Sequence, residues 1–280
     1  MLSKTRLTAI AAVLLVGVVA LVVAGCGGGG STTSETTATE ESGQNAGGGA
    51  AEEEAGGGET LAVGSDIPYP PFEQGKKGEY TGFDVELMDA SGKEIVREPE
   101  FIDESIGTIV RDIAQGKFEA VMSAATITTE REEVVAFSNP YSLSDQAILV
   151  KEGSPITGLA DLKGKVVAAQ QGTTGLELGK EKAEAKELRP FPEGPDADNA
   201  LKAGTVEAVI IDAPVAKQQA EELGGIEIVE KVPTDETYGI AVAQESTELL
   251  EQINEGLKKA IEDGSYAKFY EKWFKEPPPV

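Results

Sequence analysis

Phe118–Arg131, FEAVMSAATITTER, joins an apolar segment to the start of a helix through a short polar loop. The first five residues have the length and the apolar content of a buried strand. Thr129 and Glu132 stand three residues apart, a capping-box pattern that predicts a helix through Val135. A strand followed at once by a helix is the repeating unit of α/β proteins, so we expect further units on both sides.

Short apolar runs continue to alternate with amphipathic stretches from residue 60 to the C-terminus. The clearest helical pattern is the stripe of Ile106, Ile109, Val110 and Ile113, which ends at Gly116. The other strands that we expect are 61–64, 100–102, 147–150, 165–170, 208–211, 226–230 and 238–243, and the other helices are 83–96, 173–185, 196–202, 213–223, 247–262 and 265–274. Two sets of this alternation predict two α/β lobes, each with a parallel sheet covered by helices on both faces.

The N-terminus has the pattern of an export signal. Lys4 and Arg6 precede the uncharged run Leu7–Ala24, and the sole cysteine follows shortly after it. This order predicts a secretory signal peptide at residues 1–25, whereas the alternative is a transmembrane anchor of nearly minimal length. The run LVVAGC, which ends at Cys26, resembles the lipobox of bacterial lipoproteins. The resemblance implies cleavage before Cys26 and a lipid on its sulfur, which would tether the protein to the bacterial cell membrane, outside the cytoplasm.

Residues 27–58 consist almost entirely of Gly, Ser, Thr, Ala and Glu. These side chains bury too little apolar surface to offset the conformational entropy lost in folding, so we expect a flexible tether. Together with the lipidated cysteine it forms a segment over residues 26–58. A single cysteine allows no internal disulfide, so the exported part must be held together by its hydrophobic core.

The composition argues against several classes of function. A net charge of −25 disfavours binding to nucleic acid, which requires clustered Lys and Arg, and solubility is the simplest reading of this acidity. The chain has no histidine, which removes Ser-His triads, histidine-based metal sites and the usual general base. We therefore expect no metal and no cofactor.

Two loops that follow predicted strands carry groups suited to a small anion. In residues 123–131, hydroxyl groups, free backbone N–H groups and Arg131 converge at the start of a helix. A helix N-terminus and a guanidinium both bind carboxylates well, although Arg131 alone could also be a solvated helix residue. Gln171–Thr174 presents N–H groups and hydroxyls in the same way, although a helix cap explains these residues equally well.

A third loop adds the opposite charge preference. Asp212 ends the apolar strand 208–211, and Pro214 starts the next helix, so Asp212 either caps that helix or faces a ligand. A pocket that binds a carboxylate, combined with an aspartate for an ammonium group, would match an α-amino acid.

Eight short motifs run in the order found in one family of binding proteins. They are YPPFE (69–73), GFDVEL (82–87), TITTER (126–131), FSNPY (137–141), DLKGKV (161–166), QGTT (171–174), YGIAV (238–242) and KWF (272–274). The ordered set resembles the extracellular solute-binding proteins of family 3, which serve ATP-driven amino-acid importers. The resemblance covers essentially all of 59–280. It implies a two-lobe, type II periplasmic-binding-protein-like fold with parallel-rich sheets, hinged by two crossovers. The first lobe would be 59–144 plus 236–280, and the second 145–235.

The resemblance also implies roles for individual residues at the charged groups of the ligand. Arg131 would hold the α-carboxylate, together with the backbone N–H groups of Thr126 and Thr174. Asp212 would take the α-ammonium group, together with the Thr126 hydroxyl and the Ala124 carbonyl. Both charges of a buried zwitterion would then be paired, as burial requires.

Three further positions would face the ligand side chain. Tyr69 would form an aromatic wall, and Asp66 would meet a polar or cationic group. Ile106 stands where relatives often carry a bulky aromatic residue, and Ala124 also replaces a larger one, so we expect a roomier pocket. Phe72 is expected in the core. These residues predict a polar or basic L-amino acid as the ligand without identifying it.

The implied function is that of a monomeric substrate-binding lipoprotein of an ABC importer. It would capture the amino acid by hinge closure and deliver it to the transmembrane permease subunits, and we expect no enzymatic activity. One alternative is a ligand-sensing protein that serves a receptor. The other is a dehydratase or lyase on the same scaffold, for which Asp66 and Glu73 are the candidate acids.

Overall fold

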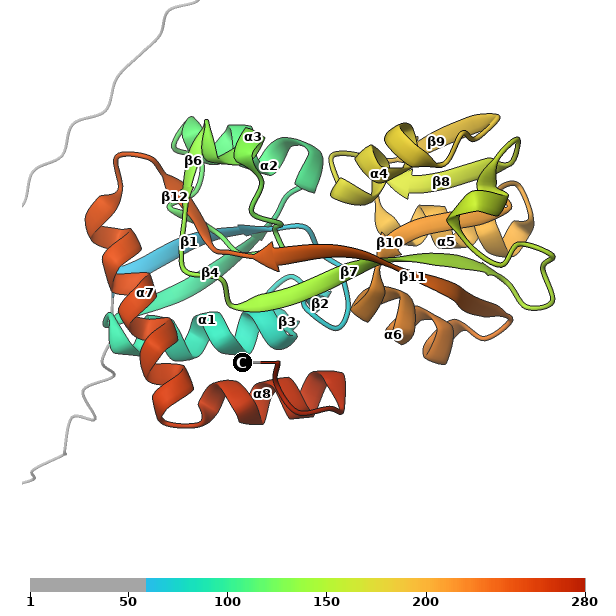
Figure 1. Ribbon diagram of the computed structural model, residues 1–280. Coiled ribbons are helices and arrows are strands. Elements are labelled where there is room, and N and C mark those ends of the chain that lie inside the picture. Colours follow the sequence, from blue (N-terminus) through green and yellow to red (C-terminus); the bar gives the residue numbers. More distant parts are fainter. Residues whose placement is uncertain (1–58, 280) are drawn as a thin grey trace, which may run out of the picture. The chain divides into compact units, whose positions relative to one another are not determined.

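The computed structural model describes residues 59–279, which contain two five-stranded sheets with helices on both faces (Figure 1). The predicted signal peptide, Cys26 and the predicted tether lie outside the described residues. We call the part built around each sheet a lobe. The first lobe contains the N-terminal and C-terminal elements of the described chain, and the second contains the elements between them.

The first sheet has the strand order β4-β1-β5-β12-β6. Its strands are β1 (Glu59–Ser65), β4 (Arg97–Asp103), β5 (Ala120–Val121), β6 (Val135–Phe137) and β12 (Ala241–Ala243). β1 is parallel to both β4 and β5, whereas β12 is antiparallel to β5 and β6. A small hairpin of β2 (Gln74–Lys76) and β3 (Glu79–Thr81) precedes the first helix.

The second sheet has the strand order β11-β7-β10-β8-β9. Its strands are β7 (Ser142–Lys151), β8 (Val166–Gln170), β9 (Glu187–Phe191), β10 (Ala208–Asp212) and β11 (Ile226–Tyr238). β8 is parallel to β9 and β10, whereas β7 is antiparallel to β10 and β11. The alternating pattern predicted parallel sheets, and four strands of each sheet do run in one direction. The exceptions are β7, which carries the chain into the second lobe, and β12, which follows its return to the first lobe.

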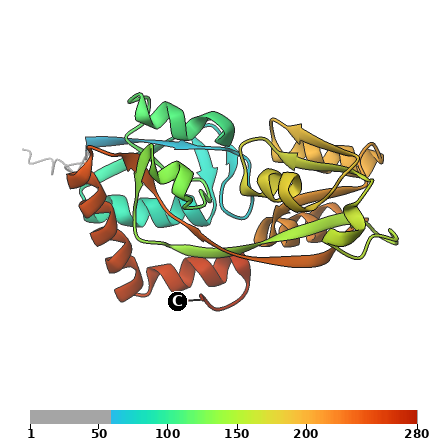
Figure 2. The same ribbon diagram turned by 45° about the horizontal axis from the view of Figure 1, so that its top comes forward.

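β7 and β11 are the longest strands, and they run side by side between the lobes (Figure 2). Their antiparallel pairing extends from Ser142 with Tyr238 to Lys151 with Ile226. The register shifts between Val232 and Glu236, so the ladder is irregular there. Both boundaries between the predicted lobes, 144/145 and 235/236, fall within these two strands.

Helices cover both faces of each sheet. The helices of the first lobe are α1 (Phe83–Glu94), α2 (Ile106–Ala114), α3 (Thr129–Glu132), α7 (Thr247–Glu262) and α8 (Ser265–Phe274), and those of the second lobe are η1 (Leu159–Leu162), α4 (Thr174–Lys182), α5 (Gly194–Ala203) and α6 (Ala213–Leu223). In the first lobe, α2 packs on one face while α1, α7 and α8 pack on the other. In the second lobe, α4 covers one face, and α5 and α6 cover the opposite one.

α1 runs unbroken through residues 89–94, DASGKE, a segment without a large apolar side chain. It passes Gly92 and ends at Glu94, two residues before the predicted end. A β-carbon at Gly92 would lie 2.7 Å from the carbonyl oxygen of Arg97, so only glycine lets β4 approach this closely. The preceding residue, Ser91, packs equally closely against Gly256 of α7, where an added β-carbon would lie 2.9 Å from the β-carbon of Ser91. The helix therefore has small residues at these positions because β4 and α7 lie close to it.

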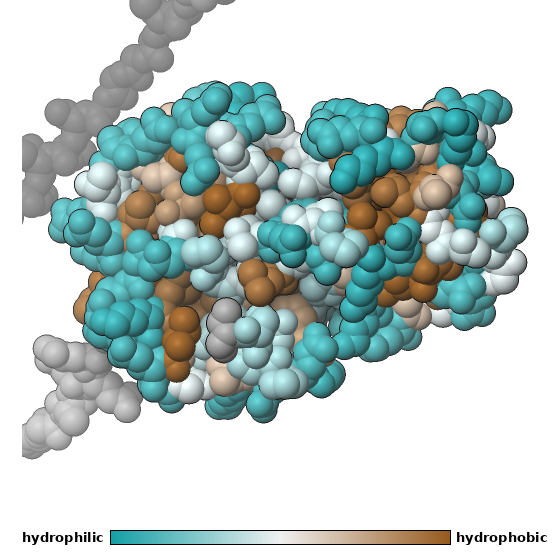
Figure 3. Space-filling model, viewed as in Figure 1, coloured by the Kyte–Doolittle hydropathy of each residue, from teal (hydrophilic) through white to brown (hydrophobic). Residues whose placement is uncertain are grey.

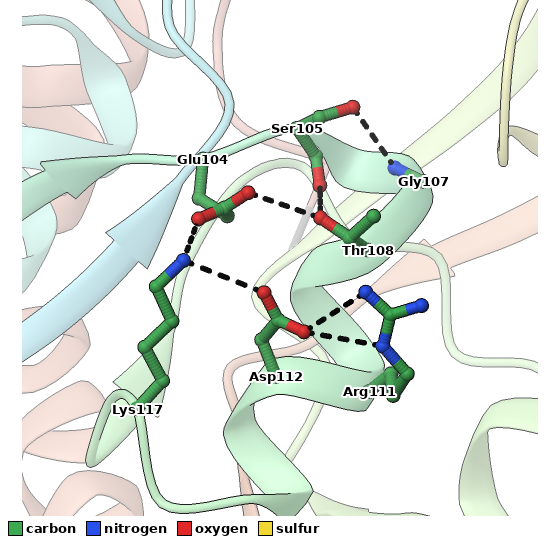
Figure 4. Close-up of polar contacts among 7 residues, drawn as sticks. All are labelled: Glu104, Ser105, Gly107, Thr108, Arg111, Asp112 and Lys117. Carbon is green, nitrogen blue, oxygen red and sulfur yellow. Dashed lines mark hydrogen bonds and ion pairs between the residues drawn. The ribbon is translucent and has the colours of Figure 1, made fainter. Parts of the chain in front are cut away.

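α2 has the predicted apolar stripe, with Ile106, Ile109 and Ile113 buried against the first sheet. A polar network holds its first turn (Figure 4). The Ser105 hydroxyl accepts a hydrogen bond from the N–H of Gly107, and Glu104 accepts from both the Thr108 hydroxyl and the Lys117 ammonium group. Asp112 pairs with Lys117 and Arg111 (Figure 4). The network fixes the position of Ile106 at the start of the helix.

The predicted cap at Thr129 is wrong by one residue, and the helix, which begins at Thr129, is shorter than predicted. Thr128 is the N-cap of α3, and its hydroxyl accepts a hydrogen bond from the N–H of Arg131 at 3.2 Å. The helix ends at Glu132, and Val135 begins β6 instead of ending the helix. Val135 is apolar enough to serve either element, and its pairing with β12 decides the outcome.

Aromatic side chains join α1, α8 and the strand ends of the first lobe. Phe72 is completely buried, as predicted, and its ring packs against Phe83, Tyr238 and Phe274. On the face shown in Figure 3, hydrophilic residues cover most of both lobes, and hydrophobic residues form separate patches. Within residues 59–279, no helix combines the length and the apolar character needed to cross a membrane.

Candidate functional site

A cavity of about 330 Å³ lies between the lobes, at the carboxyl ends of β1, β5, β8 and β10. This is the usual place for a ligand in an open α/β sheet. Its lining residues are Asp66, Tyr69, Ile106, Ser123, Ala124, Thr126, Arg131, Gln170, Thr173, Thr174 and Asp212. All eight residues that the sequence predicts as ligand contacts are among them, so the fold brings the whole predicted set together.

Asp66 follows β1 directly and is 4 % exposed. Its Oδ2 accepts hydrogen bonds from the backbone N–H of Ile106 at 2.6 Å and from the side-chain amide of Gln170 at 2.8 Å. Burial raises the pKa of Asp66 to about 7, the bond from Ile106 partly offsets this, and the negative charges of Glu193 and Asp103 raise it further. No arginine or lysine forms an ion pair with Asp66 among residues 59–279, so this end of the cavity lacks a positive charge.

Arg131 projects from α3 into the cavity, which contradicts the alternative that it is a solvated helix residue. Its Nη1 donates to the carbonyl of Thr126 at 2.7 Å, and its Nη2 donates to the carbonyl of Gly172 at 3.0 Å. The two carbonyls belong to different lobes, so the guanidinium bridges the cleft. Burial lowers the pKa of Arg131, although an arginine stays protonated in proteins. A guanidinium has five N–H donors, which leaves donors for a carboxylate.

Asp212 ends β10 and faces the cavity instead of capping α6, since its side chain makes no capping hydrogen bond. It is 7 % exposed and accepts hydrogen bonds from the Tyr69 hydroxyl, at 2.8 Å, and from the Gln146 amide. Burial raises the pKa of Asp212 to about 6, and the negative charge of Glu236 contributes to the shift. Tyr69 therefore lines the cavity and also connects the first lobe to the second through its hydroxyl.

The QGTT loop supports both readings of its sequence, each at a different residue. Thr173 is the N-cap of α4, and its hydroxyl accepts from the N–H of Leu176 at 3.2 Å. The hydroxyl of Thr174 instead donates to Glu236 at 2.7 Å. One threonine starts the helix, and the next lines the cavity with a hydroxyl already bound on one side.

Sequence reasoning missed five residues at or beside the cavity: Ser123, Gln146, Gln170, Thr173 and Glu236. Ser123 accepts the backbone N–H of Asp66 at 2.9 Å, which holds that residue in place. Gln146 donates to both Asp212 and Glu236, the latter at 2.9 Å. Ser123 and Thr173 lie inside motifs that the sequence singled out, so their hydroxyls were the available signal. Gln146, Gln170 and Glu236 lie within strands, where nothing local distinguishes a ligand-facing side chain from a solvent-facing one.

Glu73, one of the two candidate acids for catalysis, does not line the cavity. It is completely buried and accepts a hydrogen bond from the Ser65 hydroxyl at 3.3 Å. Burial beside Asp84 raises the pKa of Glu73 well above its ordinary value. Asp84 in turn accepts the backbone N–H of Ala124 at 2.9 Å, which supports a residue at a φ of 43°. The two acids therefore shape the cavity wall from behind.

The arrangement is suited to binding a zwitterion. The guanidinium of Arg131 and the buried carboxylate of Asp212 line the same cavity from different lobes, and burial strengthens the interaction of each with an opposite charge. Contacts come from both lobes, so a ligand would be enclosed by residues that approach one another when the lobes close.

Comparisons with known proteins agree with this geometry. The family model of bacterial extracellular solute-binding proteins, family 3, matches residues 61–276. The chain is 33 % identical over 222 residues to the glutamine-binding protein GlnH of an ABC transporter of Bacillus subtilis, with 78 % of this chain and 81 % of GlnH covered. It is 32 % identical over 224 residues to a putative ABC transporter arginine-binding protein 2 of Escherichia coli, with 78 % and 92 % covered.

Solved structures show the same fold. An ancestral arginine-binding protein bound to glutamine superimposes with a TM-score of 0.75 at 38 % identity, covering 78 % of this chain and 98 % of that one. The arginine-, lysine- and histidine-binding protein ArtJ of Geobacillus stearothermophilus gives 0.74 at 33 % identity, with 79 % and 97 % covered. The two sheets, the cavity between them and the match over residues 61–276 lead to one conclusion: the chain belongs to family 3 of the bacterial extracellular solute-binding proteins.

Proposed function

We propose that the protein captures an L-α-amino acid with a polar or basic side chain and delivers it to the permease of an ABC importer. The observation that carries the proposal is the placement of Arg131 and Asp212, from different lobes, at one cavity of about 330 Å³. Opposite charges provided by the two lobes are what a single zwitterion buried between them requires.

In this proposal each charge of the ligand has a partner. Arg131 and the backbone N–H groups of Thr126 and Thr174 bind the α-carboxylate. Asp212, the Thr126 hydroxyl and the Ala124 carbonyl bind the α-ammonium group. Charge-assisted hydrogen bonds of this kind are about twice as strong as neutral ones and replace the hydration that the zwitterion loses.

The side-chain end of the cavity supports a basic ligand more than a neutral one. Asp66 is buried there, and Glu193 and Asp103 add negative charge beside it. A guanidinium or ammonium group at this place would neutralise Asp66 and lower its pKa again. Relatives whose names include arginine and glutamine are both found at comparable identity, so the comparisons alone do not choose between them.

Ligand binding would close the two lobes, 59–144 with 236–280 and 145–235, about β7 and β11. Binding, and not catalysis, is the proposed activity. Arg131 and Asp212 are assigned to the charged groups common to all amino acids, Asp66 faces the ligand side chain, and Glu73 lies behind the cavity wall. We propose a monomer, since one chain provides both sides of the cavity.

The export signal and the lipid on Cys26 complete the proposal. They support a location outside the cytoplasm, on the membrane that holds the permease. Cys26→Ser should release the protein from membranes into the soluble extracytoplasmic fraction, because a single thioether is the expected point of lipid attachment. Fractionation followed by immunoblotting measures the distribution. Continued association of the variant with membranes would support an uncleaved N-terminal anchor instead.

A thermal-shift screen of residues 59–280 against the twenty amino acids tests the proposed function. A ligand that binds only the folded state raises the stability by about 2.7 kcal/mol at a concentration one hundred times its Kd. We expect basic amino acids to give the largest shifts, followed by polar ones. No shift with any amino acid would refute the proposed function.

A further inference from the structure

Glu236 joins the two lobes through one carboxylate oxygen. Its Oε2 accepts a hydrogen bond from the Thr126 hydroxyl and another from the Thr174 hydroxyl, each at 2.7 Å. Thr126 follows β5 in the first lobe, and Thr174 starts α4 in the second. Glu236 itself lies on β11, beside the register shift of that strand, and is 8 % exposed.

These contacts fix the direction of both hydroxyl groups. An ionised carboxylate can only accept hydrogen bonds, so each threonine must use its single hydroxyl proton on Glu236. What remains on each hydroxyl oxygen is acceptor capacity, and both threonines line the cavity. Two side chains that could either donate or accept are thereby made into acceptors.

One side-chain amide in the same part of the cavity is shared among three acceptors. The Gln146 amide lies within hydrogen-bond distance of Asp212, of Glu236 at 2.9 Å, and of the Thr174 hydroxyl at 3.3 Å, although it has only two protons. The Tyr69 hydroxyl serves Asp212 alone. An ammonium group has three N–H donors and could share these acceptors, since each carboxylate or hydroxyl oxygen can accept more than one hydrogen bond.

We propose that Glu236 is a positioning residue that orients the hydroxyls of Thr126 and Thr174 as acceptors and so makes this part of the cavity selective for a ligand with an α-ammonium group. The inference rests on the proposed function and deepens it. Glu236 acts through the two threonines and does not itself line the cavity. It also makes the selectivity depend on closure, because the two hydroxyls reach one oxygen only when the lobes are together.

Glu236→Gln tests the proposal with nearly unchanged side-chain volume. If the new amide turns its oxygen toward the threonines, its NH₂ meets the NH₂ of Gln146. If it turns the NH₂ toward them, the hydroxyl protons are freed to point into the cavity. Either arrangement disturbs the donor pattern, so the variant should lose discrimination for the ammonium group.

The probes are L-arginine and L-glutamine, each compared with the same molecule lacking the α-amino group, δ-guanidinovaleric acid and glutaramic acid. Calorimetry measures the ratio of the two affinities within each pair. In the unmodified protein the amino acid should bind more tightly. In Glu236→Gln this ratio should fall by about tenfold or more, since a correctly placed bond to a charged group has about this effect.

Glu227→Gln is the matched control, because Glu227 lies on the same strand but is exposed and accepts only from the N–H of Gly153. Its ratio should not change. Thr126→Val removes one of the two hydroxyls that Glu236 orients, so it should also lower the ratio of the affinities for the amino acid and its deamino analogue. Combining Thr126→Val with Glu236→Gln should lower this ratio little further than either change alone. This second route remains open if Glu236→Gln does not fold.

The outcomes separate the two levels of the proposal. If Glu236→Gln weakens both members of a pair equally, or weakens neither, Glu236 has a structural role only and this inference is overturned while the proposed function stands. If the unmodified protein binds none of the twenty amino acids, the proposed function fails and the inference fails with it.

Discussion

The two ends of the cavity differ in how far the protein itself satisfies their charges. At one end, Arg131, Asp212 and Glu236 have hydrogen-bond partners from both lobes, supplied by carbonyls, hydroxyls and an amide. At the other end, Asp66 receives two hydrogen bonds from neutral groups, and the nearby ionisable groups, Glu193 and Asp103, are also acidic.

The difference separates what is common to all amino acids from what distinguishes them. The first end can recognise an α-carboxylate and an α-ammonium group, which every amino acid carries. The second end has no positive charge from residues 59–279, so the positive charge that would pair with Asp66 has to come from the ligand side chain. Affinity should therefore depend mainly on the first end, and selectivity on the second.

Arg131→Ala should have the largest effect. Among residues 59–279, Arg131 is the only arginine that lines the cavity, and in the proposed function its loss leaves the ligand carboxylate without a charged partner. We expect a loss of about 2–5 kcal/mol in the binding free energy of every amino acid that binds, with the fold intact. Calorimetry checks the affinity and thermal denaturation the fold.

Arg111→Ala is the control for this change, because Arg111 lies exposed on α2 and pairs only with Asp112. It should leave the affinity unchanged. Unaltered binding in Arg131→Ala would disprove the assignment of the carboxylate site.

Asp66→Asn should have a smaller and selective effect. It removes a buried negative charge at the side-chain end, so the affinity for L-arginine should fall about tenfold to a hundredfold while that for L-glutamine changes little. The ratio of the two affinities, measured by calorimetry, is the quantity to compare. An equal loss for both ligands would contradict a selective role of Asp66.

The pH dependence of the affinity for L-arginine should also depend on Asp66. Because the pKa of Asp66 is raised to about 7, the carboxyl is protonated below that pH and charged above it. Binding of a cationic side chain requires the charged form, so the affinity for L-arginine should rise from pH 5.5 to about 8.5. Asp66→Asn should remove the part of this rise that is centred near pH 7. The pKa of Asp212 is raised to about 6, so L-glutamine should show a smaller rise, centred near pH 6, that Asp66→Asn leaves unchanged.

Glu193→Gln should have the smallest effect. Glu193 is partly exposed at the N-cap of α5, so solvent screens its charge, and we expect the preference for L-arginine over L-glutamine to fall only about twofold to fivefold. The effect should shrink further as salt is added. Asp196→Asn, an exposed change in the first turn of the same helix, is the control. If Glu193→Gln shows the same preference for L-arginine over L-glutamine as the unmodified protein in low salt, Glu193 does not contribute to the site.

The sequence pattern predicted several residues of the cavity because they lie in loops that directly follow strands. The loop 123–131 and Asp212 each follow an apolar run, and the ends of parallel strands meet at one edge, whereas Asp66 was predicted only through the resemblance to the family. The alternation of strands and helices likewise predicted most elements. Where it erred, at Val135, pairing with a strand more than a hundred residues away decided between helix and sheet.

The residues that escaped prediction are those whose surroundings depend on the arrangement of the lobes. Gln146 and Glu236 lie within β7 and β11, where a polar residue normally indicates a solvent-facing position. Their side chains meet because these strands pair between the lobes, and no local pattern contains that information. The antiparallel strands of each sheet were missed for the same reason.

The position of β12 in the first sheet has a consequence for folding during synthesis. β12 lies between β5 and β6, and β6 pairs with no other strand among the described residues. The first sheet therefore stays incomplete until residues 241–243 have left the ribosome, after the whole second lobe. The second lobe is one continuous segment and can fold as a unit earlier. We expect the N-terminal part of the chain to wait, partly assembled, for its last strand, which makes it the part most dependent on protection from aggregation.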